Sequence, residues 1–168
     1  MTDRPHRLRR LRLMLINLAA FALLALTSSC KGSLYEKTER FENATWSSQT
    51  PRFEFDITDT SQLYDIILEV VHSSDYGYQN LYTQLKVEFP DTTAPRTTLL
   101  SLQLSDEHGT WQGKCSGTRC TTPLAFMTKT KFAATGKHSL TFAQHTRFEQ
   151  IEGIEQITLR LLKHQGTN

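Results

Sequence analysis

The chain has 168 residues, 21% of them charged, and a formal net charge of +2. Five arginines lie within the first 12 residues, so residues 30–168 contain 14 basic and 16 acidic residues, a balance of −2. Because the only basic cluster lies at the N-terminus, the composition argues against a nucleic-acid partner.

The first 29 residues have the three parts of a secretory signal. A basic head precedes the apolar run LMLINLAAFALLAL at residues 13–26, and three small residues follow at 27–29. As a helix, this run would cover about 21 Å, which is less than the roughly 30 Å hydrocarbon core of a bilayer. We therefore predict a cleaved signal peptide rather than a membrane-spanning helix.

Cys30 directly follows the small residues, and this position indicates a bacterial lipoprotein signal. In that chemistry the Cys30 thiol receives a diacylglyceryl group, the chain is cut before it, and the new amine is acylated. Two or more acyl chains give a stable anchor, whereas one holds a protein only marginally. The alternative is a secreted protein in which Cys30 has no such role. We predict a lipoprotein signal peptide at 1–29, a lipidated tether at 30–33 and a single domain at 34–168.

Lipidation of Cys30 would leave two cysteines, Cys115 and Cys120, on either side of Gly117. In an oxidising periplasm they could pair across this tight loop and add roughly 2 kcal/mol of stability. Two free thiols are the alternative. We expect no metal site, because two thiols without a nearby histidine supply half of a tetrahedral zinc ligand set.

Short segments of alternating apolar residues predict strands in the first half of the domain. Residues 33–41 combine strand character with several charges, which is typical of an edge strand. Residues 53–57 alternate, so that their two Phe and one Ile face the core. The apolar run 64–72 favours a buried central strand, and residues 81–89 alternate again. We predict that these last two segments form a long hairpin through the turn at 73–77.

The second half continues the pattern. Leucines alternate through residues 100–104, a strand pair is expected at 124–132 and 139–143, and a last strand at 154–162. No part of residues 30–168 has a strong helical period. The sequence therefore predicts an all-β fold, a single antiparallel β-sandwich of eight or nine strands that is jelly-roll-like.

We expect no catalytic residue and no cofactor. The five histidines beyond the signal are isolated, and the sequence contains no His-x-x-x-His, no calcium loop, no Gly-x-Ser-x-Gly and no phosphate-binding glycine loop. A secreted hydrolase would need two facing carboxylates. Asp56, Asp59 and Asp75 instead fall at predicted strand ends and turns, where solvated acids are usual.

Aromatic residues near predicted turns are the best candidates for binding. Trp46, Tyr76, Tyr78 and Trp111 either close the ends of the sandwich or stack on a ligand. An arginine nearby would give a bidentate polar anchor. The candidate binding residues, for a partner protein or a glycan, are Tyr76, Tyr78, Asn80, Trp111 and Arg147.

Several short phrases lie in order along residues 34–162: LYEK at 34–37, Trp46, FEFDITDT at 53–60, YGYQNLY at 76–82, GTWQG at 109–113, QHTR at 144–147 and GI at 153–154. Together they resemble the gliding motility lipoprotein family GldH.

This resemblance implies a lipoprotein of gliding Gram-negative bacteria that supports cell-surface motility and an associated secretion machinery, without enzymatic activity. We expect lipid on Cys30 to hold the chain at a membrane and the domain to dock onto other envelope proteins. Residues 31–34 contain no acidic run, so we expect the periplasmic face of the outer membrane. A glycan-binding β-sandwich lipoprotein is the alternative.

Overall fold

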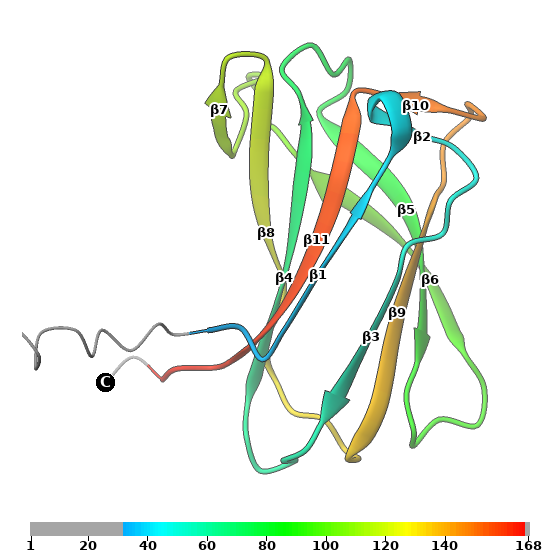
Figure 1. Cartoon of the computed structure of the whole chain (residues 1–168), viewed down its shortest axis with the longest axis vertical. Helices are drawn as coiled ribbons and strands as arrows, with labels where there is room; N and C mark the ends of the chain where they lie inside the picture. The colour runs from blue at the N-terminus through cyan, green and yellow to red at the C-terminus, as the bar shows by residue number, and fades with distance from the viewer. Residues whose placement is uncertain (1–31, 167–168) are drawn as a thin grey trace, which may run out of the picture. The chain divides into compact units, whose positions relative to one another are not determined.

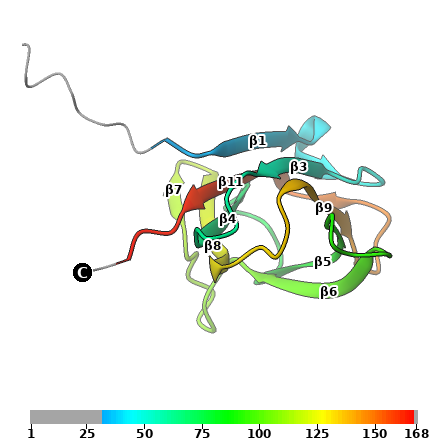
Figure 2. The same ribbon diagram turned by 90° about the horizontal axis from the view of Figure 1, so that it is seen from below.

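Two antiparallel sheets pack face to face, as Figures 1 and 2 show from two directions. The computed structural model describes residues 32–166, so the predicted signal peptide and Cys30 lie outside the described residues. The first sheet has five strands in the order β1-β11-β4-β8-β7. Their bounds are β1 Tyr35–Arg40, β11 Ile154–Lys163, β4 Tyr64–Ser73, β8 Arg119–Thr130 and β7 Lys114–Ser116.

The second sheet has four strands in the order β3-β9-β5-β6. Their bounds are β3 Arg52–Ile57, β9 Gly136–Gln144, β5 Asn80–Glu88 and β6 Arg96–Gln103. A short ladder joins β2 (Thr45–Trp46) to β10 (Ile151–Glu152), and one 3-10 turn, η1 (Glu42–Ala44), precedes β2. The predicted all-β antiparallel sandwich is therefore confirmed, with nine strands in its two main sheets. Among residues 32–166, no helix has the length and apolar content needed to cross a bilayer.

The predicted hairpin between residues 64–72 and 81–89 is wrong. The first of these strands, β4, pairs with β11 and β8, whereas β5 pairs with β6 and β9 in the other sheet. The predicted pair at 124–132 and 139–143 is wrong for the same reason, because β8 and β9 also lie in different sheets. Period-two alternation requires only that one face of a strand be buried, and two strands can meet this condition from facing sheets.

The core lies between the sheets and is rich in aromatic rings. Phe53, Phe55 and Ile57 of β3 are buried, as the alternation predicts. The rings of Phe53 and Phe126 both contact Phe142 of β9, with ring centroids 5.9 and 5.8 Å apart, so that β8 and β9 meet across the sandwich. Phe53 and Phe142 are fully buried, and each stabilises the fold by roughly 1.5–3 kcal/mol.

Cys115 and Cys120 form a disulfide, so the bridge rather than two free thiols is present. The two residues lie opposite each other in the β7–β8 ladder. Between them Gly117 has a φ of +61°, a conformation that glycine adopts without a Cβ penalty and that closes this tight hairpin.

Candidate functional site

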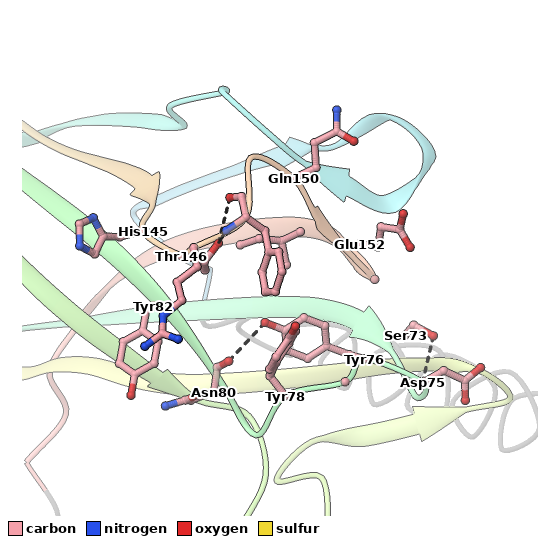
Figure 3. Close-up of a pocket in the computed structure, with 15 residues that line it drawn as sticks. Ser73, Asp75, Tyr76, Tyr78, Asn80, Tyr82, His145, Thr146, Gln150 and Glu152 are labelled. Carbon is pink, nitrogen blue, oxygen red and sulfur yellow. Dashed lines mark hydrogen bonds between the residues drawn. The ribbon is translucent and has the colours of Figure 1, made fainter.

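A pocket of about 1170 Å³ opens at one end of the sandwich. Two segments line it: residues 73–82, which carry the chain from β4 to β5, and residues 145–153, which connect β9 to β11. Figure 3 shows side chains of both segments converging, with Tyr76 and Tyr78 at the centre. We call this site the aromatic pocket.

Tyr76 holds the first segment in place. Its ring is buried, and its hydroxyl donates to the carbonyl oxygen of Asn80 at 3.2 Å. Burial, with a smaller contribution from Tyr78, raises the pKa of Tyr76 to about 12, so this hydroxyl remains a donor at neutral pH. Gly153 lies against the ring with a φ of +86°, and a Cβ there would come within 3.3 Å of Tyr76 Cδ2. Glycine thus permits both the backbone conformation and the close approach.

Hydrogen bonds within the second segment fix its loop. The Gln144 side-chain amide donates to the carbonyl oxygen of Phe148 at 3.0 Å, and the Thr146 hydroxyl donates to the same oxygen at 3.1 Å. The backbone N–H of His145 donates to the carbonyl oxygen of Tyr82 at 3.0 Å, which ties this loop to β5. These contacts fix the backbone at Phe148, whose side chain lines the pocket.

Three aromatic rings of the pocket are largely exposed. The exposed fractions are 51% for Tyr78, 50% for Tyr82 and 56% for Phe148. The Tyr78 ring packs edge-on against Tyr76 at 5.6 Å and lies 6.3 Å from Phe148. Single exposed apolar side chains are common on protein surfaces and need no explanation. A cluster of exposed rings around a cavity is uncommon and is typical of a binding surface.

The pocket carries charges of both signs. Arg147 and His145 lie on one segment with Glu152, and Asp75 lies on the other. Within the described part of the chain, Arg147, Asp75 and Glu152 form no ion pair. The Asp75 carboxylate accepts one long hydrogen bond, from the Ser74 hydroxyl at 3.5 Å, so these charges are not neutralised by a neighbouring charge there.

The structure brings together four of the five candidate binding residues, Tyr76, Tyr78, Asn80 and Arg147. Trp111 lies outside the pocket lining and packs on His72, with centroids 4.5 Å apart. Trp46 is wholly buried in the core.

Sequence reasoning missed two exposed rings of the pocket, Tyr82 and Phe148. Tyr82 occupies an outward position in the alternation of residues 81–89, and a large aromatic ring at an outward position could have indicated a binding residue. Phe148 lies in a segment without a pattern, so nothing in the sequence marked it.

Among residues 32–166, no group of three or more His, Cys, Asp or Glu side chains is arranged to hold a metal ion. Of the acids considered from the sequence, Asp75 lines the aromatic pocket, and Asp56 and Asp59 do not.

His72 is fully buried, and its ring lies 6.1 Å from that of Tyr76, which lines the aromatic pocket. Its Nδ1–H donates to the carbonyl oxygen of Ser73 at 2.9 Å, so in the neutral ring Nε2 accepts from the Thr122 hydroxyl at 3.1 Å. Burial lowers the pKa of His72, because the protonated ring would lose its hydration. The folded protein therefore holds this imidazole neutral.

Stability should consequently fall in mild acid. The pKa of His72 is lower in the folded chain than its ordinary value near 6.5, so the unfolded chain takes up the proton first. The contribution of His72 is complete above about pH 6.5 and declines as the pH drops towards the lowered folded pKa. Urea denaturation at about pH 7 and pH 5.5 measures this decline. We expect it to shrink in His72→Phe and to persist in His108→Gln, which alters an exposed side chain; an equal decline in all three proteins would contradict this assignment.

Comparison with known proteins adds the family. A model of the GldH lipoprotein family matches residues 33–161. The chain is also 24% identical over 151 residues to a protein described as a gliding motility lipoprotein GldH homolog from Christiangramia forsetii, and this match covers 85% of this chain and 91% of that protein. Because the family match spans nearly the whole sandwich, this chain belongs to the GldH lipoprotein family.

Proposed function

We propose that this protein is a non-enzymatic, lipid-anchored component of the cell envelope that supports gliding motility and its associated secretion machinery by docking onto partner proteins through the aromatic pocket. Family membership and the name of the Christiangramia forsetii relative support the envelope and motility parts. The observation that carries the docking part is the cluster of three exposed rings around a large pocket. Aromatic residues and arginine are enriched among the residues that dominate protein interfaces.

The anchor in this proposal is lipid on Cys30 after cleavage of residues 1–29. The following residues, 30–33, act as a tether, and the sandwich of 34–168 lies at the periplasmic face of the outer membrane. The sequence from 1 to 30 supports this assignment through its basic head, its apolar run and the cysteine after small residues.

Replacing Cys30 with Ser should release the protein from membranes. A serine cannot form the thioether, so the acyl chains that give a lasting anchor would be absent. Membrane fractionation and mass spectrometry of the N-terminal peptide measure the result. The double variant Cys115→Ser/Cys120→Ser should stay in the membrane fraction, because it removes the disulfide and leaves Cys30 in place. If Cys30→Ser fractionated with membranes after losing residues 1–29, or if the N-terminal peptide of the unaltered chain carried a free thiol at Cys30, lipid anchoring would be excluded.

The docking proposal predicts that the exposed rings dominate partner capture. A photo-crosslinking residue at position 78 in intact envelopes should capture a protein partner. Truncating two interface rings in Tyr78→Ala/Phe148→Ala should weaken binding of that partner by about tenfold or more. Leu34→Ala is the matched control, since Leu34 is equally exposed and is not part of the pocket lining. Equal capture by the double variant and the control would contradict docking through the pocket.

Glycan binding is the second candidate, and the composition of the pocket favours it specifically. Sugar rings stack on exposed aromatic faces, and their hydroxyls pair with amides and charged groups of either sign. Asn80, Arg147, Asp75 and Glu152 supply such groups around the rings. Glycan arrays probed with the purified chain separate the two candidates. Glycan binding that is lost in Tyr78→Ala supports a glycan ligand. No glycan binding, together with capture of a protein at position 78, supports docking.

A further inference from the structure

The two sheets have four edges, formed by β1 and β7 in the first sheet and by β3 and β6 in the second. An exposed edge offers unpaired backbone N–H and C=O groups to any extended chain, and natural proteins protect such edges with charges, short strands or covering segments. Three of the four edges are protected in these ways.

The protection differs among the three. The six residues of β1 (YEKTER) include four charged ones, and β3 (RFEFDI) carries three charged side chains on its exposed face. The Lys37 ammonium group of β1 also donates to the carbonyl oxygen of Arg52 in β3, at 2.8 Å. The third edge, β7, is only three residues long and is joined to β8 by the disulfide.

The fourth edge, β6, lacks this protection. Its eight residues (RTTLLSLQ) carry a single charge, Arg96, at the strand's beginning, and contain no proline and no acid. Leu99 in the middle of the strand is 58% exposed. Figure 2 shows β6 at the margin of its sheet, with β5 on its inner side.

The hydrogen bonds of the neighbouring strand show which β6 groups face outward. The Tyr82 carbonyl accepts from His145 N–H, so the polar groups of Tyr82 point towards β9 and away from β6. Tyr82 lies opposite Ser101, which must therefore direct its own N–H and C=O away from β5. Because backbone direction alternates along a strand, the N–H and C=O groups of Leu99 and Thr97 also point away from β5. No backbone bond from another described residue reaches these outward groups.

We propose that the β6 edge binds the β6 edge of a second copy of this chain, antiparallel and with Leu99 opposite Leu99 on a two-fold axis. This register places Thr97 opposite Ser101 of the other copy and forms roughly six interchain hydrogen bonds, two at each paired position. The two four-stranded sheets become one continuous sheet across the dimer.

The charges and side chains of β6 favour a second copy of this chain as the partner that binds this edge. In this register the two Arg96 side chains lie at opposite ends of the shared ladder, each facing Leu102, and no like charges meet. The exposed Leu99 side chains meet on one face, where a directly opposed apolar pair stabilises the strands. A two-fold contact between identical patches is also the commonest way in which soluble chains associate.

A cysteine in place of Leu99 tests this register in the full-length chain. Opposed residues in a hydrogen-bonded antiparallel pair have Cα atoms about 5.5 Å apart, which is within disulfide range. We expect L99C to form a disulfide-linked dimer in the envelope, visible on non-reducing gels, with the two introduced cysteines joined in the mapped peptide. Gln84→Cys is the matched control: Gln84 is exposed on the same face, directly across from Leu99 on β5.

Equal dimer formation by the two variants, or linkage of L99C to a different protein, would overturn the proposal. So would the absence of any dimer with L99C when the folded chain is otherwise intact. These outcomes are separable from failure of the aromatic pocket, because position 99 is not part of that pocket.

A second pair of variants tests pairing through the backbone. No residue among 32–166 bonds the Leu99 N–H, so Leu99→Pro should fold, since proline is tolerated on edge strands whose N–H faces outward. Amide hydrogen exchange at Thr97 and Ser101 should be slow in the unaltered chain and in Leu99→Thr. We expect it to be about tenfold faster or more in Leu99→Pro, where both central interchain bonds are lost. Fast exchange at these amides in the unaltered chain would also overturn the proposal.

Discussion

Trp46→Ala should lower the free energy of unfolding by about 3–5 kcal/mol, the usual cost of removing a large buried ring. Trp46 has no exposed surface, and its ring stacks on Phe41 with centroids 4.8 Å apart. Its indole N–H donates to the carbonyl oxygen of Gln49 at 2.8 Å. Trp46 also pairs with Ile151 of β10, so its loss should loosen the strand that carries one wall of the aromatic pocket.

Equilibrium denaturation of the purified chain measures this loss. Trp46→Phe is the matched variant, because it keeps a ring against Phe41 but lacks the donor to Gln49. We expect it to cost only about 1–2 kcal/mol. Equal stability of Trp46→Ala and Trp46→Phe would contradict this prediction, because it would show that the volume and stacking of the ring do not stabilise the fold.

Gly113→Ala should destabilise the protein by about 3 kcal/mol or more, although it adds a single methyl group. A Cβ at Gly113 would lie 2.1 Å from the Thr121 carbonyl oxygen and 2.6 Å from the Thr122 hydroxyl oxygen. The first of these is backbone of β8, which cannot move aside as a flexible side chain can. Displacing Thr122 would also disturb its hydrogen bond to the buried His72.

Gly77→Ala is the control for this prediction, because no atom lies within 4 Å of a Cβ at that position and its φ is not in the left-handed region. Thermal or urea denaturation of the two variants side by side measures the difference. We expect Gly77→Ala to remain close to the unaltered chain. Similar stability of the two variants would show that β8 can yield at Gly113.

The sequence predicted the strands well, because the physical cause of each strand is local. Phe53, Phe55 and Ile57 alternate, and burying every second side chain of an extended segment requires no knowledge of its partner. The charged edge strand before Phe41 was confirmed as β1, for the same local reason. The pairing of strands was predicted less well, since the choice between a hairpin and a crossing to the facing sheet depends on the whole chain.

The candidate site shows the same division. A tyrosine near a turn, such as Tyr78, and a lone arginine, such as Arg147, were recognisable as residues suited to binding. Their meeting in one pocket was not, because the two segments that line it are about seventy residues apart and are joined through contacts such as that between His145 and Tyr82. The same reasoning selected Trp111 as a candidate binding residue, but its ring packs on His72 instead.

By itself, the sequence of this protein determined its β class, its core-facing positions, its family resemblance and the cysteines placed to form a bridge. These follow from residue type and spacing along a few neighbouring positions. Only the tertiary structure decided which strands share a sheet, which rings are exposed and which edge is left open. These depend on contacts between distant residues, whose free energies are gained only when the whole sandwich closes.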